Sequence, residues 1–333
     1  MKKRGRGVAC CWYGIARTAE MDRASAWVEM DDGGTAKVAV GVTEIGEGIL
    51  QVLAQVAAEE IGCRPDQVVL ADNDTARVPE AAHAGATRQT YMCANAVALA
   101  CRDARKRFDQ EMARYLGTTP EDIAVHAGKL WLKSKPDITM SLAEAIQICK
   151  KRGVVPVGSG GFSTYATPLD PETGRSDTWQ TYVWGTQIAE VEVDTVTGEV
   201  KVLEMWAAHD VGRAINPQGV EGQIEGAIAQ GVGYGLKEEF NPKRPGFSAY
   251  KLPTSLDMPE VHSIIIENPD PNSPLGAKGI GEPALLATAP AILNAIYDAV
   301  GVRITRLPAT PERILEALKE KEQRKLVHAE AAK

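Results

Sequence analysis

The stretch Gly41-Val-Thr-Glu-Ile-Gly-Glu-Gly48 joins a β-hairpin pattern to a helical pattern, and this junction indicates the fold. Before it, residues 26–40 alternate between apolar and polar side chains around Asp31-Asp-Gly-Gly34, as in two strands joined by a tight turn. After it, apolar side chains recur at helical spacing from Gly48 to Ile61, and Gly62 is placed to end the helix. The order strand, strand, glycine-rich turn, helix predicts an α+β fold.

The rest of the first half predicts further helices and then a long connection. Residues 90–116 carry an apolar stripe with few helix breakers. Ser141-Leu-Ala-Glu144 is a capping box that opens a short helix ending at Gly153. From 154 to 180 the chain is rich in Gly, Ser, Pro and Thr without periodicity, which predicts an irregular connection. We therefore expect a first mixed α/β lobe over residues 1–155.

A second mixed α/β lobe is expected over residues 186–318, after a connection at 156–185. It begins with alternating strands at 187–194 and 199–203 around the turn Thr195-Val-Thr-Gly198. Its helices are predicted at 222–236, at 290–300 and after the N-terminal signal Thr310-Pro-Glu312. Residues 319–333 are rich in Lys, Glu and Ala and are expected to form a frayed, solvated tail.

Composition excludes several classes of protein. The chain has 333 residues, with 37 Lys+Arg against 44 Asp+Glu and a formal charge of −7, so it offers no basic stripe for nucleic acid. No run approaches the roughly 18 apolar residues needed to cross a bilayer. The basic start lacks the apolar core and cleavage site of a signal peptide. We expect a cytoplasmic protein that binds neither nucleic acid nor a membrane.

The sequence lacks the common metal-binding and nucleophile motifs. The six cysteines form no C-x-x-C pair and no iron–sulfur pattern, and the five histidines are too scattered for a ligand set. No P-loop and no G-x-S-x-G elbow is present. We therefore expect no metal site built from protein ligands alone and no iron–sulfur cluster on this chain.

Two glycine-rich turns are candidate ligand sites. Gly46-Glu-Gly48 stands between a strand and a helix, where backbone N–H groups can face an anion, but Gln51 replaces the third glycine of a dinucleotide fingerprint. Gly276-Ala-Lys-Gly-Ile-Gly-Glu-Pro283 could deliver the Glu282 carboxylate into a closed site. It could equally be a plain helix entry in which Glu282 caps the helix or pairs with Lys278.

Four segments together resemble one family. They are Gly41-Val-Thr-Glu-Ile-Gly-Glu-Gly48, Ala84-Gly-Ala-Thr-Arg-Gln-Thr-Tyr-Met-Cys-Ala-Asn-Ala96, Gly222-Gln-Ile-Glu-Gly-Ala227 and Gly276-Ala-Lys-Gly-Ile-Gly-Glu-Pro283. In this order they are similar to the xanthine dehydrogenase and aldehyde oxidase family of molybdenum hydroxylases, in the C-terminal half of the molybdopterin-binding part. The resemblance is closest to the medium molybdopterin subunit of split enzymes such as nicotinate dehydrogenase.

The resemblance implies a cofactor and partners. The cofactor would be molybdopterin with molybdenum, in the cytosine dinucleotide form, and the metal would be held through the pterin. A larger molybdopterin-binding subunit would supply the upstream half of the pocket. Separate subunits would carry FAD and the [2Fe-2S] clusters, in agreement with the cysteine pattern of this chain.

The resemblance also implies roles for particular residues. The family's base falls on Glu282. Tyr13, in Cys11-Trp-Tyr-Gly14, lies in a segment that approaches the metal in relatives, although a structural role is the favoured interpretation for it. Glu47 replaces the Gln that is common between the two glycines, and a carboxylate there donates only when protonated. The expected cofactor-binding residues are Gly46, Glu47, Gly48, Gly85, Ala86, Thr87, Arg88, Gln89, Gln223, Lys278 and Gly281.

The implied activity is hydroxylation of an aldehyde or of a ring carbon next to nitrogen, in a nicotinate-like or purine substrate, with oxygen from water. Glu282 would accept the proton, a role that needs an ionised carboxylate in a largely dry pocket. Electrons would pass to the iron–sulfur and flavin subunits. The alternatives are a non-catalytic cofactor-binding or assembly subunit and, with less support, a carbon monoxide dehydrogenase-like enzyme.

Overall fold

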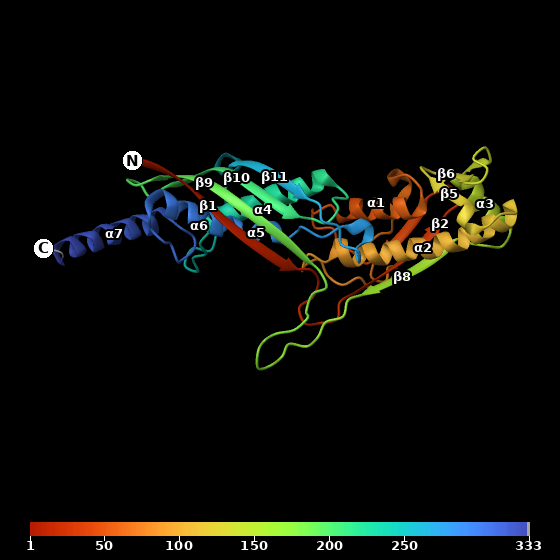
Figure 1. The fold of residues 1–333 in the computed structure, drawn as a ribbon, viewed down its shortest axis with the longest axis horizontal. Helices are drawn as coiled ribbons and strands as arrows, with labels where there is room; N and C mark the ends of the chain where they lie inside the picture. Colours follow the sequence, from red (N-terminus) through yellow and green to blue (C-terminus); the bar gives the residue numbers. More distant parts are fainter. Residues whose placement is uncertain (332–333) are drawn as a thin grey trace.

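The computed structural model describes residues 1–331 as an elongated molecule with two lobes (Figure 1). Within that range the strands form two four-stranded sheets, one in each lobe, and a small three-stranded sheet. Both chain termini lie at the end formed by the second lobe (Figure 1). The predicted α+β class with two mixed lobes is confirmed.

The sheet of the first lobe has the order β4-β3-β2-β8. The predicted hairpin is β2 (Arg23–Met30) and β3 (Ala36–Val40), which pair antiparallel. Its other strands are β4 (Val68–Leu70), parallel to β3, and β8 (Val157–Ser163), antiparallel to β2. Helices α1 (Ile49–Ile61) and α2 (Gln89–Leu116) pack against it, and Gly62 and Gly117 end them in the left-handed conformation.

Strand β8 falls where the sequence predicted an irregular connection, so that prediction was wrong for 157–163. Glycines mask the strand in the sequence, and the packing requires them. A Cβ on Gly158 would lie 2.1 Å from the Ala100 carbonyl oxygen, and one on Gly160 would lie 2.2 Å from that of Ala96. Helix α2 therefore rests directly on the backbone of β8, where larger side chains would separate the two elements.

A small unit closes the far end of the first lobe. It contains β5 (Ile123–His126), β6 (Lys129–Leu132) and β7 (Thr139–Ser141), followed by α3 (Leu142–Lys151). The predicted capping box is present, because Ser141 Oγ accepts from the Glu144 N–H and Glu144 Oε2 accepts from the Ser141 N–H. Short 3₁₀ turns lie at Pro65–Gln67, Pro120–Asp122, Ser255–Asp257 and Pro274–Gly276.

The second lobe has a sheet of order β1-β9-β10-β11. Its strands are β1 (Lys2–Gly14), β9 (Tyr182–Asp194), β10 (Val200–Asp210) and β11 (Glu260–Ile266). Its helices are α4 (Pro217–Leu236), α5 (Pro283–Leu286), α6 (Thr288–Val300) and α7 (Pro311–Ala331). Helix α6 packs on β1 and β9 and also contacts α4.

Strand β1 corrects the predicted lobe boundary. It pairs along its whole length with β9, from Lys2 opposite Asp194 to Gly14 opposite Tyr182, so residues 2–14 belong to the second lobe. Gly5 and Gly7 let the α6 backbone approach, since a Cβ on Gly7 would lie 2.1 Å from the Ala295 nitrogen. Local sequence pattern cannot reveal a partner strand that lies about half the chain away.

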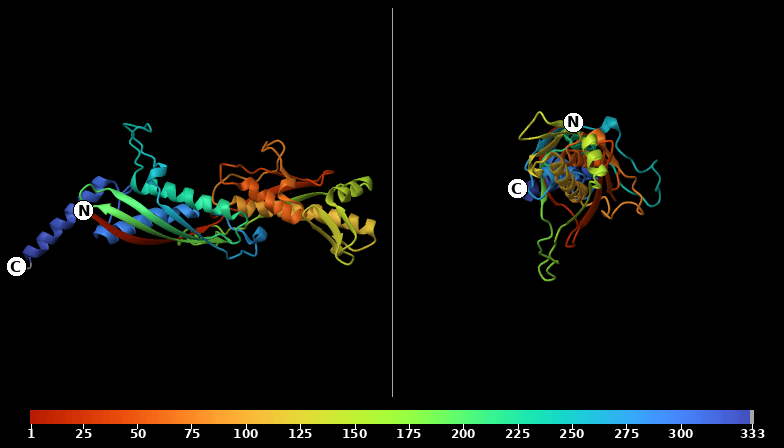
Figure 2. Two further views of the ribbon diagram at one scale, coloured as in Figure 1. Left: turned by 90° about the horizontal axis from the view of Figure 1, so that it is seen from above. Right: turned by 90° about the vertical axis from the view of Figure 1, so that its right-hand side faces the viewer.

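The C-terminal segment also differs from the prediction of a frayed tail over 319–333. Helix α7 continues to Ala331 and projects from the second lobe (Figure 2, left), while residues 332–333 lie outside the described residues. Good helix formers and i,i+4 pairs such as Glu320–Arg324 extend the helix into solvent. The described side chains after Leu318 are mostly exposed, as predicted.

One apolar stretch, Pro283–Val300, has the length and composition of a membrane-spanning helix. It comprises α5 and α6 and is largely buried between the sheet and α4 in the second lobe. Its apolar character is therefore explained by its place in the core.

Two chain segments connect the lobes, residues 15–22 between β1 and β2 and residues 164–181 between β8 and β9. The longer connection hangs from the junction as a loop (Figure 1). Its end is anchored by Trp179, whose Nε1 donates to the Ala16 carbonyl at 3.2 Å and whose ring packs on Gly14. The candidate site lies at this junction.

Candidate functional site

The loop that carries Glu282 reaches from the second lobe to the first. A Cβ on Gly279 would lie only 2.3 Å from the Thr87 carbonyl oxygen, so the two backbones touch because this position is glycine. This contact joins the predicted segments 276–283 and 84–96. The fold thus brings together two motifs separated by almost two hundred residues.

The Glu282 carboxylate is held by two hydroxyl groups. Tyr13 OH donates to Glu282 Oε2 at 2.5 Å, and Thr87 Oγ1 lies 3.1 Å from the same oxygen. The backbone N–H of Glu282 in turn donates to Thr87 Oγ1 at 3.3 Å. Burial, the hydrogen bond to Glu282 and the charge of that carboxylate raise the pKa of Tyr13, which keeps its hydroxyl protonated as a donor.

The second interpretation of the loop, a plain helix entry, does not describe this geometry. Glu282 stands at the N-cap of α5, but its side chain makes no capping hydrogen bond. The Lys278 ammonium instead pairs with Asp210 Oδ2 at 2.7 Å, and both side chains are buried. The side chain of Glu282 is exposed, so the described residues form one wall of its surroundings and not the dry pocket that was expected.

The segment that presents Thr87 adopts an unusual backbone. Ala86 and Thr87 both have left-handed φ values, 51° and 52°, which non-glycine residues rarely adopt. The Ala16 N–H donates to the Ala86 carbonyl at 3.0 Å, which ties the turn to the junction between the lobes. This strained turn aims the Thr87 hydroxyl at Glu282.

Arg88 holds the turn from beneath. It is fully buried, and its Nε and Nη2 form a two-point ion pair with Asp22 at 2.8 Å. The remaining N–H groups donate to the carbonyl oxygens of Ala81, His83 and Arg23. All five guanidinium N–H groups are therefore used within the protein, and the side chain has none left for a cofactor.

The turn at Gly46-Glu-Gly48 is filled by a carboxylate of the chain itself. Glu44 accepts from the N–H groups of Gly46 and Gly48, each at 2.9 Å, and from that of Leu50 at 3.2 Å. Burial opposes ionisation of Glu44, but these N–H groups outweigh it and hold its pKa below the usual value. A ligand anion reaches the N–H groups that were expected to bind it only when Glu44 moves away.

Glu47 points back into the same turn. Its Oε2 accepts from the Ile45 N–H at 2.7 Å, while its Oε1 is buried without a partner among residues 1–331. Burial raises the pKa of Glu47, and the neighbouring Glu44 carboxylate raises it further. A carboxyl group with a raised pKa can carry the proton that would let it replace a glutamine as a donor.

A cavity of about 210 Å³ lies between residues of all four predicted segments and opens beside Glu282. It is lined by the predicted base Glu282 and by most of the predicted cofactor-binding residues: Glu47, Gly85, Thr87, Arg88, Gln89, Gln223 and Gly281. A smaller hollow of about 80 Å³ shares several of these residues and adds Gly48 and Lys278. Gly46 and Ala86 belong to the same turns but do not line either cavity.

The lining fits a flat, polar heterocycle. A Cβ added at Gly46 or at Gly48 would meet nothing within 4 Å, so this side of the turn is open. The Gln223 amide lines both hollows and has no hydrogen-bond partner within the described part of the chain, so it can offer a donor and an acceptor. With the buried Oε1 of Glu47, these groups suit the edge of a pterin.

Sequence reasoning missed the residues that support the Glu282 loop. Gln187 Nε2 donates to the Ala284 carbonyl, and Thr288 Oγ1 donates to Gln187 Oε1 at 2.8 Å. His209 is fully buried beside Gln187, and burial lowers its pKa to about 4, so it is neutral. These polar residues lie in apolar strand and helix patterns and carry no motif. Glu44 was also missed, although its position two residues before the glycine turn was a signal.

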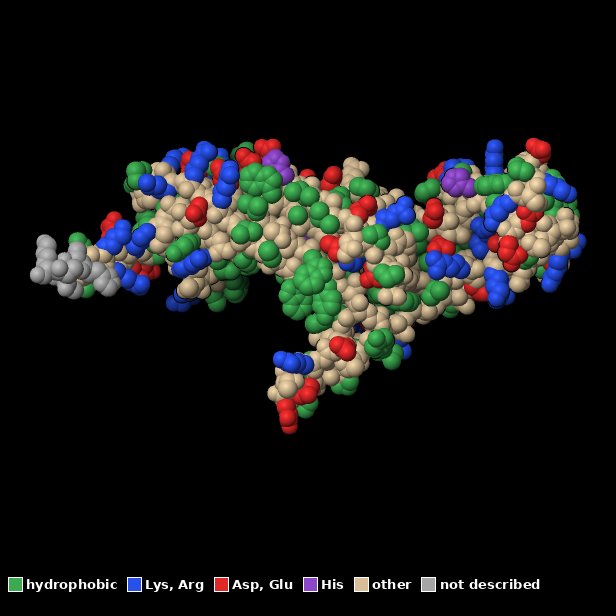
Figure 3. Space-filling model, in the orientation of Figure 1, with side chains coloured by type: hydrophobic (Ala, Val, Ile, Leu, Met, Phe, Trp, Pro, Cys, Tyr) green, Lys and Arg blue, Asp and Glu red, His purple; other side chains and the backbone are tan. Residues whose placement is uncertain are grey.

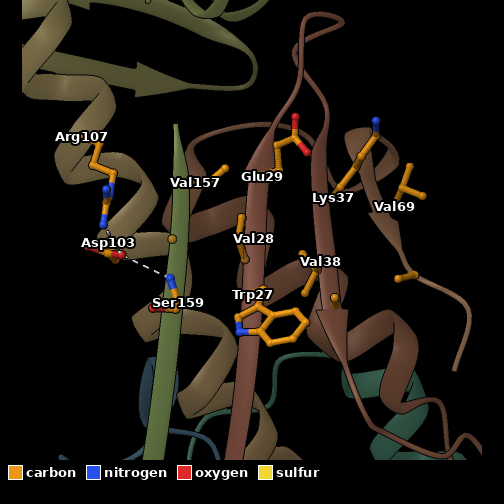
Figure 4. A pocket seen from close by; sticks show the side chains of 13 residues that line it. Trp27, Val28, Glu29, Lys37, Val38, Val69, Asp103, Arg107, Val157 and Ser159 are labelled. Atoms are coloured by element: carbon orange, nitrogen blue, oxygen red, sulfur yellow. Dashed lines mark hydrogen bonds and ion pairs between the residues drawn. The ribbon is translucent and has the colours of Figure 1, made fainter. Parts of the chain in front are cut away.

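Another cavity lies elsewhere, on the first lobe. It measures about 550 Å³ and lies on the outer face of sheet β4-β3-β2-β8, with Trp27, Val69 and Val157 in its lining (Figure 4). None of the predicted site residues lines it. It is therefore separate from the cavity at Glu282.

Comparison with known proteins places this chain and its fold in a family. The model of the molybdopterin cofactor-binding domain matches residues 1–259. The chain belongs to this family, as found in xanthine dehydrogenases and aldehyde oxidoreductases, which confirms the family predicted from the four segments. The cofactor of the family is molybdopterin with molybdenum.

Three relatives illustrate the similarity. The chain is 31% identical over 325 residues to the xanthine dehydrogenase molybdenum-binding subunit of Escherichia coli, covering 94% of this chain and 42% of the relative. It is 32% identical over 303 residues to the 6-hydroxypseudooxynicotine dehydrogenase complex subunit gamma of Paenarthrobacter nicotinovorans, covering 86% and 36%. The structure of quinoline 2-oxidoreductase from Pseudomonas putida superposes with a TM-score of 0.84 at 28% identity, covering 96% and 42%.

The chain therefore spans less than half the length of these relatives. The family model, which matches residues 1–259, ends before the loop that carries Glu282.

Proposed function

We propose that this chain is a molybdopterin-binding subunit of a multi-subunit molybdenum hydroxylase and that Glu282 is its general base. The observation that carries the proposal is the Glu282 carboxylate, held by Tyr13 and Thr87 at the mouth of a glycine-lined cavity. This loop and the Thr87 turn come from different lobes and meet at one point. Such convergence on an otherwise unpaired carboxylate is typical of a catalytic group.

Different residues of the chain have different roles in the proposed reaction. When bound, the cofactor supplies the two-electron oxidation of a substrate carbon with oxygen derived from water. Glu282 Oε2 is fixed by the two hydroxyl groups, so Oε1, which has no partner within residues 1–331, is the oxygen that accepts a proton. Gln223 and Glu47 would hold the pterin edge, and Gly281 would let it approach the backbone.

The substrate is proposed to be an aldehyde or a nitrogen heterocycle of the nicotinate or purine type. Support comes from the names of the relatives, which include a xanthine dehydrogenase subunit, a 6-hydroxypseudooxynicotine dehydrogenase subunit and quinoline 2-oxidoreductase. We further propose the cytosine dinucleotide form of the cofactor. A larger molybdopterin-binding subunit, an FAD subunit and a [2Fe-2S] subunit would complete the enzyme.

The first experiment is a native purification of the chain with analysis of molybdenum and iron and mass spectrometry of the co-purifying polypeptides. Molybdenum together with larger, flavin and iron–sulfur subunits is the expected result. A lone polypeptide without molybdenum would contradict the proposal.

The second experiment compares Glu282→Gln with Glu59→Gln, an exposed glutamate on α1 far from the cavity. Glu282→Gln should keep its molybdenum and lower kcat by about 10²-fold or more, since a general base contributes at least this much. Glu59→Gln should leave turnover and metal content unchanged. Full turnover in Glu282→Gln would instead identify the chain as a non-catalytic, cofactor-binding subunit.

A further inference from the structure

The sheet of the second lobe is covered by helices on one face alone, within the described chain. Strand residues alternate between faces, and Gly5 and Gly7 face helix α6. Val8 and Trp12 therefore face the other way and are 53% and 58% exposed. The helices of the lobe, α4, α5 and α6, contact the sheet on the glycine side, so this other face is bare.

The bare face is apolar over its half nearest the lobe junction. The pairing register places Val8 opposite Ile188, and Trp12 opposite Trp184, across β1 and β9. Across β10, the exposed Ile264 and Ile266 of β11 continue the same surface. We call Val8, Trp12, Trp184, Ile188, Ile264 and Ile266 the outer apolar face; each is at least 39% exposed.

The other half of the same face is charged and satisfied within the chain. Lys2 pairs with Glu192 at 2.7 Å and Arg6 with Glu190 at 2.6 Å. Figure 3 shows this division, with green side chains gathered toward the junction and blue and red ones toward the termini. The basic residues that border the outer apolar face are thus already neutralised, unlike the free basic rim expected of a surface that binds anionic lipid.

The outer apolar face contains the aromatic groups that dominate protein interfaces. Trp12 packs edge-on against Tyr182 with ring centroids 5.6 Å apart, and its ring lies 6.3 Å from that of Trp184. Exposed clusters of tryptophan and tyrosine with branched aliphatic neighbours form the centres of stable interfaces. A soluble chain with this much exposed apolar surface is expected to have a permanent partner.

We propose that the outer apolar face docks the remaining part of the molybdenum-binding subunit, carried on a separate polypeptide. This rests on the function proposed above. The match covers 42% of the xanthine dehydrogenase subunit, so more than half of that single polypeptide lies outside the part equivalent to this chain. Where the two parts are separate chains, an apolar interface must replace the covalent link. Tyr13, beside Trp12 on the same strand, holds Glu282 on the opposite face, so docking here occurs next to the open site.

Cys10 is a natural probe of this docking. It is exposed and lies between Val8 and Trp12 on the outer face, whereas Cys63, Cys93, Cys101 and Cys149 are buried. In the native complex, alkylation of Cys10 by iodoacetamide should slow at least tenfold relative to the isolated chain. A Lys106→Cys variant, with the new thiol on exposed helix α2, should react at the same rate in both states. A Cys10 that stays reactive in a complex containing the larger polypeptide would overturn the proposal.

Substitution gives an independent test with a matched control. Trp184 and Trp27 are 56% and 51% exposed, but Trp27 lies on the other lobe (Figure 4). Trp184→Asp should weaken binding of the larger polypeptide by about 30-fold or more, as expected for an interface anchor. Trp184→Phe should restore most of the affinity, and Trp27→Asp should bind normally. Equal loss in both Asp variants, or a homodimer that buries Cys10, would contradict the proposed contact.

The readouts separate this proposal from the function on which it rests. A complex that protects Cys10 but contains no molybdenum would support the docking face and refute the proposed function. A complex that contains molybdenum while Cys10 stays exposed would do the reverse. Thermal unfolding of each variant chain shows whether a loss of binding reflects a loss of folding.

Discussion

Arg88 shows how a residue that lines the candidate cavity can use its side chain to stabilise the fold. Its sequence position, within Gly85-Ala-Thr-Arg-Gln89, suggested contact with the cofactor. Its guanidinium is instead buried with Asp22 and with three carbonyl oxygens, and these bonds hold the Thr87 turn in place. A missing partner here would leave an uncompensated buried charge.

We therefore predict that Asp22→Asn lowers the free energy of unfolding by about 3–5 kcal/mol. Glu80→Gln is the matched control, because Glu80 pairs with Arg23 at 2.9 Å but both side chains are exposed, and such pairs contribute below about 1 kcal/mol. Urea unfolding of the isolated chain measures both. Similar small losses in the two variants would show that Arg88 is not a structural anchor.

His209 gives the chain a predictable pH dependence. Burial lowers its pKa to about 4, whereas the imidazole of the unfolded chain titrates near 6.5. As the pH falls below 6.5, the His209 imidazole takes up a proton in the unfolded state but not in the folded state, so stability decreases until the pH reaches about 4. This contribution to the free energy of unfolding decreases by about 2 kcal/mol between pH 7 and pH 5.

Urea unfolding at both pH values of the wild type and of His209→Gln tests this. The variant, which has no imidazole, should show a smaller loss of stability between pH 7 and pH 5 by about 2 kcal/mol. Carboxylates titrate in both proteins alike, so the difference between them isolates His209. Parallel stability curves would show that the buried imidazole is protonated or hydrated in the folded chain.

At the residue scale, motifs identified the parts of the site that depend on small residues. Glycine spacing located the Glu282 loop, and the structure shows that Gly279 in this loop permits a close backbone approach to Thr87. Gln187 and His209 left no trace in the sequence, since one polar residue in an apolar strand has no periodicity of its own. Glu44 was overlooked because its role, filling the N–H groups of the turn, follows from side-chain direction.

At the element scale, packing of helix α2 on β8 depends on glycine. We predict that Gly160→Ala lowers the free energy of unfolding by about 2–4 kcal/mol, because its methyl group would collide with the backbone of Ala96 and Ala100. Gly161→Ala, one residue later, meets nothing within 4 Å and should change it by less than about 0.5 kcal/mol. Thermal unfolding of the pair gives the result, and equal effects would mean that α2 can shift.

Elements with strong local signals were predicted within a few residues. The hairpin, α1, α2 and α3 all combine clear periodicity with a capping glycine or a capping box. Strands β1 and β8 were missed because both contain several glycines, which lower β propensity and hide alternation. Their identity as strands depends on distant partners and on the helices that rest on them.

At the scale of the whole molecule, helix α7 is predicted to contribute through its first turns. Ile314 is fully buried, so Ile314→Ala should cost about 2–4 kcal/mol. Ending the chain after Leu318 removes residues 319–327, which are mostly exposed, with the segment that follows them, and it removes the bond from Lys321 to the Val300 carbonyl, at a cost below about 2 kcal/mol. Calorimetry compares the two, and a larger effect of the truncation would show that the projecting helix is part of the core.

The two-lobed plan could be predicted from the sequence, but the path of the chain through it could not. The repeated order of hairpin and helix indicated two units of similar construction. The membership of β1 in the second lobe and of β8 in the first is invisible locally, because pairing such as that of Val8 with Ile188 joins residues far apart in the chain.

The pairing of β1 with β9 determines when, during synthesis, β1 can join its sheet. Lys2 leaves the ribosome well before its partner Asp194, which follows only after the whole first lobe has been made. At about 5–20 residues per second, the N-terminal strand waits roughly 10–40 s before it can pair. During this interval the first lobe can fold from residue 23 onward, while an unpaired strand carrying Val8 and Trp12 stays available to chaperones.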